Sequence, residues 1–151
     1  MSRVHSFVTL VILAFGISIL AAPLAVQAQE IQDPHAQDKA DAMRVAQDWI
    51  AQMDSGEYAW CYNNSAEYLQ SIITLQDWNT LVTSIRQPMA ELLSRELVDI
   101  QYSTSLPAVP DGEYVVIILR SSYANKAEAY ETVTPMRDTD GQWRVAGYYF
   151  R

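Results

Sequence analysis

The sequence predicts an α+β domain in which helices pack against one face of a curved, four-stranded antiparallel sheet. Between residues 38 and 94, apolar side chains recur every three or four positions, which is the period of one face of a helix. From Arg95 onward the period changes to two, as expected for strands. Short turn sequences separate the predicted strands, and this favours a meander of neighbouring antiparallel strands.

The first 28 residues have the layout of a secretory signal peptide. Arg3 precedes an almost unbroken apolar run over 7–20, and Val-Gln-Ala at 26–28 places aliphatic and small residues before a cleavage site. The run is followed by Pro23, and it is shorter than a membrane-spanning helix, which needs about 20 apolar residues. We therefore expect cleavage near Ala28 and a periplasmic or secreted protein with no stable membrane insertion. An uncleaved membrane anchor is the alternative.

Acidic residues dominate the predicted mature chain, residues 29–151. Of the ten Lys and Arg residues only Arg3 lies in the leader, so nine remain against eighteen Asp and Glu, a net charge of −9. Such a chain repels phosphate backbones and anionic lipid surfaces, so we predict no nucleic-acid partner. Its length fits a single domain, which we place at 38–151 after a flexible polar tether over 29–37.

The residue types that several catalytic chemistries require are scarce. His5 falls in the leader and His35 in the tether, so the predicted domain has no imidazole for Ser-His-Asp or Cys-His catalysis. Cys61 is the only cysteine, and we interpret it as a small buried residue rather than a reactive thiol or an intermolecular disulfide. One cysteine and carboxylates make a poor zinc site. We predict no metal, no cofactor and no catalytic residue.

Two helical segments are predicted first. One covers 38–55, with Gly56 in the position of a left-handed C-cap. The second covers 58–69 and is broken near Asn63-Asn64, a turn signal.

A third helix opens at Thr74, where Asp77 completes a capping box. We expect it to continue to about Ser94, with a kink or break near Pro88. Its predicted apolar face comprises Trp78, Leu81, Val82, Ile85, Met89, Leu92 and Leu93.

Four strands follow, over 95–106, 113–124, 127–137 and 142–150. The second is apolar on both faces at 115–119, which favours a central position in the sheet. Asp138 to Gly141 reads as a hairpin turn between the last two strands.

Several ordered blocks of the chain resemble the bacterial family called domain of unknown function 4019. The blocks are 131–136 with 140–149, which is similar to the end of the family, 103–107 with 111–116, which is similar to its middle, and Trp78 with 86–88, which is similar to its third-helix region. The resemblance spans about residues 40–151. It implies a helical layer wrapped by a bent sheet, as in cystatin-like and nuclear-transport-factor-2-like proteins. That broad set contains enzymes, ligand binders and interaction modules, and the family has no assigned activity, so no catalytic residue is carried over.

Aromatic residues are the first candidates for a binding site. Trp49, Trp60, Trp78 and Trp143 could line a pocket for an apolar or aromatic ligand, or they could fill the core. We favour core filling for Trp49, Trp78 and Trp143, and weigh the two interpretations about equally for Trp60.

Charged residues in strand context are the second candidates. Glu131 and Arg144 lie on strands that pair across the turn at 138–141, and they could anchor a ligand, or Glu131 could act as a general base. A structural ion pair or a solvent-facing position is the favoured alternative. Arg86 and Arg95, on either side of Pro88, could bind an anion, or they could cap a helix C-terminus, which is the interpretation we favour because the helix dipole attracts cations there.

A third possibility places Tyr62, Tyr102 and Asp99 together as a phenol and a desolvated carboxylate for acid–base chemistry, although no spacing requires it. Taken together, the residues favour a non-catalytic binding or interaction module for a small apolar or aromatic ligand or a protein partner. One alternative is a small pocket enzyme that uses Asp, Glu and Tyr without a metal. Another is a homodimeric assembly element that pairs through an exposed apolar sheet face carrying Val115, Ile117 and Leu119 or their neighbours.

Overall fold

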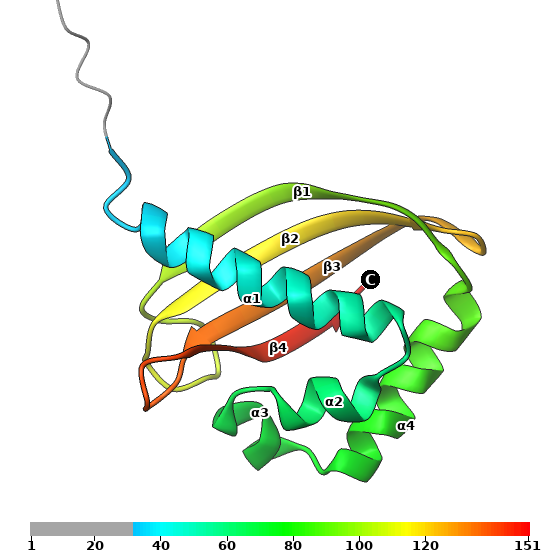
Figure 1. Cartoon of the computed structure of the whole chain (residues 1–151), viewed down its shortest axis with the longest axis horizontal. Helices are drawn as coiled ribbons and strands as arrows, with labels where there is room; N and C mark the ends of the chain where they lie inside the picture. The colour runs from blue at the N-terminus through cyan, green and yellow to red at the C-terminus, as the bar shows by residue number, and fades with distance from the viewer. Residues whose placement is uncertain (1–31) are drawn as a thin grey trace, which may run out of the picture. The chain divides into compact units, whose positions relative to one another are not determined.

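The computed structural model describes residues 32–151, so the predicted signal peptide and residues 29–31 of the predicted tether lie outside the described residues. Helices and strands follow one another in two blocks, which confirms the predicted α+β class (Figure 1). The helical block contains α1 (Ala36–Asp54), α2 (Tyr58–Asn63), α3 (Glu67–Ile72), α4 (Leu75–Arg86) and a 3₁₀ turn (Gln87–Met89). The strands are β1 (Leu92–Ser103), β2 (Tyr114–Tyr123), β3 (Lys126–Arg137) and β4 (Trp143–Phe150).

The sheet is an antiparallel meander in the order β1-β2-β3-β4, with β1 at one edge, and α1 crosses one face of it (Figure 1). Val115, Ile117 and Leu119 of β2 point to the face that the helices cover and are at most 8% exposed. This corrects the expectation that these three residues form an exposed face for pairing two copies. Their neighbours Val116 and Ile118 lie on the opposite face and are half-buried.

The third helix is shorter than predicted. Thr74 caps its start as predicted, since Thr74 Oγ1 accepts from the Asp77 amide at 3.2 Å, while the Asp77 carboxylate accepts from the Thr74 hydroxyl and not from its backbone amide. The prediction that it continues to Ser94 is wrong, because regular helix ends at Arg86 and β1 begins at Leu92. If the helix continued, Pro88 would have no N–H to donate and its ring would clash with the carbonyl four residues earlier.

The chain between α4 and β1 is held against the β2–β3 hairpin. The amide of Asn125 donates to the Met89 carbonyl at 3.1 Å, and the amide of Ala124 donates to the Glu91 carbonyl at 2.8 Å. Between these two anchor points Ala90 has φ 61° and ψ −145°, a backbone region that is sparsely populated for residues other than glycine. The hairpin contacts therefore redirect residues whose apolar pattern alone fits a helix.

The core lies between α1 and the covered face of the sheet. Trp49, Trp78 and Trp143 are 2%, 3% and 7% exposed, which confirms their prediction as core residues. Trp49 Nε1 donates to the Cys61 carbonyl at 2.9 Å, and Trp78 Nε1 donates to the Tyr58 carbonyl at 2.9 Å. Cys61 is fully buried, as predicted, and burial raises the pKa of its thiol to about 12.

The start of α1 departs from the predicted tether. Ala36 and Gln37 are helical, and the His35 ring stacks on Tyr102 of β1 with 3.6 Å between ring centroids. His35 Nδ1 also lies 3.3 Å from Asp38 Oδ2. The expectation of a folded domain without an imidazole is therefore wrong.

No helix within residues 32–151 is both long and apolar enough to cross a membrane.

Candidate functional site

Two acids and two arginines meet where the C-terminal ends of α1 and α4 approach the sheet. Asp54 ends α1, Arg86 ends α4, Arg95 lies on β1 and Glu131 lies on β3. We call these four residues the charge cluster. Glu131 is fully buried, and the Arg86 and Arg95 side chains are 6% and 14% exposed. Arg95 lies 2.9 Å from Glu131 and 2.6 Å from Asp54, while Arg86 lies 3.2 Å from Glu131 and also pairs with Asp54. Two positive and two negative charges therefore balance.

Both oxygens of the Glu131 carboxylate accept several hydrogen bonds. The donors are Nε and Nη2 of Arg95, Nη1 of Arg86, and the hydroxyls of Ser121, Tyr123 and Tyr148. Burial alone raises the pKa of Glu131, but the Arg95 charge and the hydroxyl donors lower it further than burial raises it, so the net pKa is below its ordinary value. Glu131 is therefore an ionised, fully bonded carboxylate at neutral pH.

The phenols of buried Tyr123 and half-buried Tyr148 remain protonated donors. Burial, together with the nearby Glu131 charge, raises the pKa of Tyr123 and of Tyr148. Tyr123 donates to Glu131 at 2.8 Å and accepts from Arg95 at 3.1 Å, so its hydroxyl bridges the carboxylate and the guanidinium. This arrangement holds the charges of Glu131 and the two arginines in fixed positions.

The structure brings together only some of the residues that the sequence singled out. Arg86 and Glu131 meet, but Arg144 does not reach Glu131. Arg144 instead pairs with Asp140 at 2.7 Å and Asp138 at 3.1 Å, within its own hairpin. The register explains this, since Phe150 is opposite Glu131 while Arg144 is opposite Met136, close to the turn.

Asp54, which pairs with both arginines, was not among the residues predicted from the sequence. An acid at the last position of a helix opposes the helix dipole, so it needs compensating cations. That unfavourable placement was the available signal.

The other candidates are scattered. Trp78 is buried in the core, whereas Trp60 on α2 is 41% exposed. The proposed acid–base group does not assemble through hydrogen bonds, because its members have separate partners. Tyr62 donates to the Ile73 carbonyl, Tyr102 donates to Glu113, and Asp99 accepts from Gln101.

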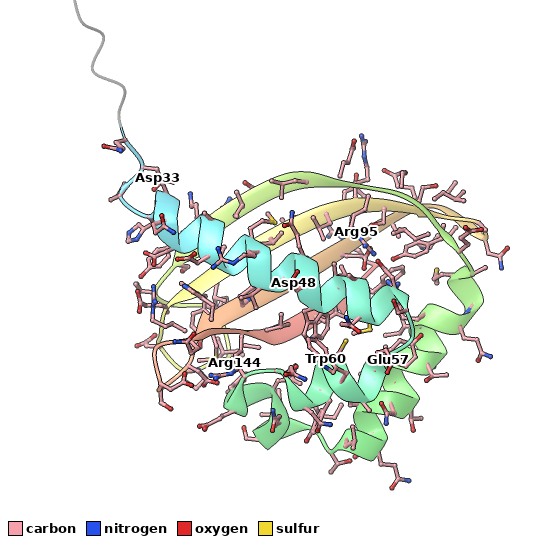
Figure 2. The ribbon with its side chains drawn as sticks, viewed as in Figure 1. Asp33, Asp48, Glu57, Trp60, Arg95 and Arg144 are labelled. Carbon is pink, nitrogen blue, oxygen red and sulfur yellow. The ribbon has the colours of Figure 1, made fainter. Side chains whose placement is uncertain are left out.

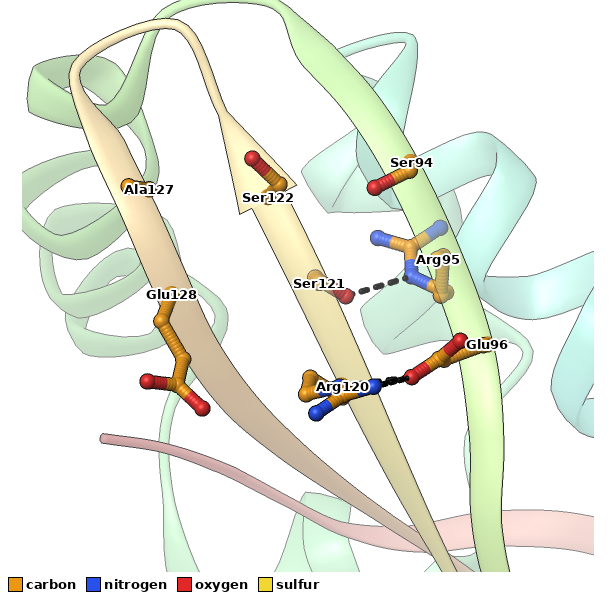
Figure 3. A pocket seen from close by; sticks show the side chains of 8 residues that line it. All are labelled: Ser94, Arg95, Glu96, Arg120, Ser121, Ser122, Ala127 and Glu128. Atoms are coloured by element: carbon orange, nitrogen blue, oxygen red, sulfur yellow. Dashed lines mark hydrogen bonds and ion pairs between the residues drawn. The ribbon is translucent and has the colours of Figure 1, made fainter.

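A polar depression adjoins Arg95 at the hairpin end of the sheet (Figure 3). Its volume is about 550 Å³, and it is lined by Ser94, Arg95, Glu96, Arg120, Ser121, Ser122, Ala127 and Glu128. Arg120 donates to Glu96 at 2.6 Å, and both side chains are more than half exposed. Water screens such an exposed pair, so the depression would hold a charged ligand only weakly.

A second, mostly apolar groove runs between α1 and the β1–β2 part of the sheet, and we call it the α1–β1 groove. Its volume is about 250 Å³, and it is lined by Met43, Ala46, Gln47, Ile50, Arg95, Glu96, Leu97, Ile117 and Leu119. Leu97 is 51% exposed because β1 is an edge strand that α1 leaves partly uncovered. Arg95, labelled between the strands and α1 in Figure 2, lines this groove and also belongs to the charge cluster. Within residues 32–151, no three His, Cys, Asp or Glu side chains are grouped to hold a metal ion.

Comparison with known proteins places the chain in a family. The family model described as protein of unknown function (DUF4019) matches residues 45–148, from within α1 into β4. A 2.5 Å structure from Catenulispora acidiphila is similar in fold, with a TM-score of 0.50 at 8% identity, covering 78% of this chain and 92% of that one. No curated protein matches the chain. The chain belongs to the DUF4019 family.

Proposed function

We propose that this protein is an exported, non-catalytic binding module whose ligand occupies the α1–β1 groove. The observation that carries the proposal is the contrast between two neighbouring regions. The buried acid Glu131 has its oxygens filled by donors of its own chain, whereas the adjoining groove has apolar walls and open volume. Export is supported by the leader-like sequence of residues 1–28.

The state of the buried acid favours binding over the alternative of a small pocket enzyme. A carboxylate that serves as a general base works best when its pKa is raised toward the operating pH. The pKa of Glu131 is instead lowered, and its hydrogen bonds would have to break before it could reach a substrate. The cluster therefore serves as a rigid wall beside the groove.

The dimensions of the groove suit a small ligand. An apolar cavity on the order of 150 Å³ holds a benzene molecule, so a groove of about 250 Å³ holds one ring with a short chain. Ala46 and Ile50 of α1, with Ile117 of β2, are buried side chains that form a fixed floor. Met43 is an adaptable wall because its unbranched side chain repacks easily.

A neutral fluorescent probe tests this proposal. 4-(Dimethylamino)benzonitrile, which has one ring with short substituents, changes its emission when it enters an apolar site, and we expect it to bind the protein purified with residues 29–151. Gln47 is an exposed groove residue of α1, so Gln47→Trp covers the groove without disturbing the core. We expect this variant to bind the probe at least tenfold more weakly.

The matched control is Gln76→Trp, the same change at an exposed position of α4 that does not line the groove. We expect it to bind like the wild type. Equal binding by all three proteins, or no binding by the wild type, would overturn the proposal, as would a turnover activity that persists through repurification and is lost in Gln47→Trp.

A further inference from the structure

We infer that the ligand of the α1–β1 groove is electrically neutral, with an apolar body and one hydrogen-bond acceptor that meets Arg95. This inference rests on the proposed binding function and adds the chemical class of the ligand. It is carried by the charge balance around Arg95, by the donors that Arg95 has left, and by the lining of the groove.

The charge of Arg95 is already balanced by acids of the cluster. Arg95 binds both oxygens of Asp54, at 2.6 and 3.0 Å, and Oε1 of Glu131 at 2.9 Å. Arg86 contacts the same two acids, so neither guanidinium has a charge to spare. A carboxylate entering the groove would be a third anion beside two existing ones, in a partly desolvated place where an uncompensated charge is costly.

A cationic ligand is disfavoured for a related reason. Glu96 is the acidic side chain among the residues that line the groove, and it already pairs with Arg120. Its side chain is 57% exposed, so any further attraction to a cation is screened by water.

Hydrogen bonding by Arg95 selects among neutral ligands. A guanidinium has five N–H donors, two of them on each Nη. Nε and Nη2 of Arg95 donate hydrogen bonds to Ser121, Glu131, Asp54 and Tyr123. Among residues 32–151, Nη1 donates only to Asp54. One N–H of Nη1 is therefore available in a side chain that lines the groove. A carbonyl or ether oxygen satisfies this donor without adding charge.

Three molecules with the same ring and chain separate the possibilities. Hydrocinnamamide carries a neutral carbonyl, hydrocinnamate carries a carboxylate at neutral pH, and propylbenzene carries no acceptor. In an NMR titration of ¹⁵N-labelled protein at neutral pH, we expect the amide to bind at least tenfold more tightly than the carboxylate. We expect it to bind several-fold more tightly than propylbenzene, and the Arg95 side-chain Nη signals to shift with the amide and not with propylbenzene.

A charge variant sharpens the test. Asp54→Asn keeps the shape of the side chain but removes one negative charge, so the cluster gains a net positive charge. We expect the preference for the amide over the carboxylate to shrink or reverse in this variant. Asp48→Asn, at an exposed position of the same helix outside the cluster, changes the net charge equally and is expected to keep the wild-type preference.

The outcomes are distinguishable. If none of the three molecules binds and 4-(dimethylamino)benzonitrile also fails to bind, the proposed function is wrong and the inference falls with it. If the probe binds but wild-type protein takes hydrocinnamate as tightly as the amide, the binding function stands and neutrality is refuted. If the amide binds no better than propylbenzene, the role of Arg95 as a donor is refuted. Should Asp54→Asn not fold, the wild-type series decides by itself.

Discussion

Arg95 donates two hydrogen bonds to a single oxygen, Oε1 of Glu131, from Nε at 3.0 Å and from Nη2 at 2.9 Å. The two residues lie on β1 and β3, so the arginine side chain reaches across the central strand β2. Ser121 of β2 lies between them, accepting from Arg95 and donating to Glu131. Glu131 thereby ties three strands together beneath the ends of two helices.

Removing the charge of Glu131 is expected to be costly. In Glu131→Gln, two buried arginines keep only Asp54 as a counter-charge, and breaking a buried pair in this way destabilises by about 3–5 kcal/mol. Urea unfolding followed by circular dichroism measures the loss. Glu128→Gln, at an exposed position of the same strand, is expected to change stability by no more than about 0.5 kcal/mol. Equal stability of the two variants would contradict the role of the cluster.

The same carboxylate predicts a dependence of stability on pH. Its pKa in the folded protein lies below the ordinary 4.5, so the unfolded chain binds the proton more readily. The contribution is fully present above the unfolded pKa and is lost as pH falls through the folded one. We expect wild-type stability to fall below about pH 4.5.

Glu131→Gln is the control for this loss, and its stability should fall less steeply over the same range. The carboxyls of Asp33, Asp41 and Asp140 also have lowered pKa values and remain in both proteins. Parallel pH profiles would mean that those exposed groups, and not Glu131, govern the acid transition.

The tryptophans are predicted to differ in their tolerance of phenylalanine. Nε1 of Trp143 is buried and has no hydrogen-bond partner among the described residues, so Trp143→Phe removes an unsatisfied donor. Trp49→Phe and Trp78→Phe instead remove the hydrogen bonds to the carbonyls of Cys61 and Tyr58. We expect Trp143→Phe to be the least destabilising, by about 1 kcal/mol or more, in thermal unfolding. The reverse order would refute this assignment.

Ala90 is predicted to carry removable strain. Its φ of 61° with ψ of −145° is accessible to glycine and costly for other residues, so Ala90→Gly should stabilise by about 1 kcal/mol. Ala51→Gly, at an exposed position inside α1, is expected to destabilise by about 1 kcal/mol. Opposite signs in chemical unfolding would support the strain, and destabilisation by both changes would exclude it.

The sequence was sufficient for features that depend on local period. The helix over 38–55, the helix start capped by Thr74 and the four strands follow from spacing and turn residues, and all are present with small shifts at their ends. Leu92 and Leu93 fit a helical period and a strand equally well, so period could not decide between them. The contacts of Met89 and Glu91 with the β2–β3 hairpin decided it, and these are distant in sequence.

The candidate site depended on contacts that spacing does not reveal. Glu131 stood out as a charge among apolar strand residues, but its partners Arg86 and Arg95 lie 45 and 36 residues away. Arg144 was considered because its strand pairs with β3. The strand register pairs Arg144 with Met136, close to the turn, and this register is known only from the structure.

The composition of the charge cluster has a consequence for the folding pathway. Its members come from α1, α4, β1 and β3, so their ion pairs require the helices to have docked on a sheet that is already in register. Such contacts are absent from a transition state in which only neighbouring strands have met. Weakening them should therefore accelerate unfolding while leaving the refolding rate nearly unchanged, as stopped-flow measurements on Glu131→Gln would record. The cluster then governs how long the native state persists, more than how quickly it is reached.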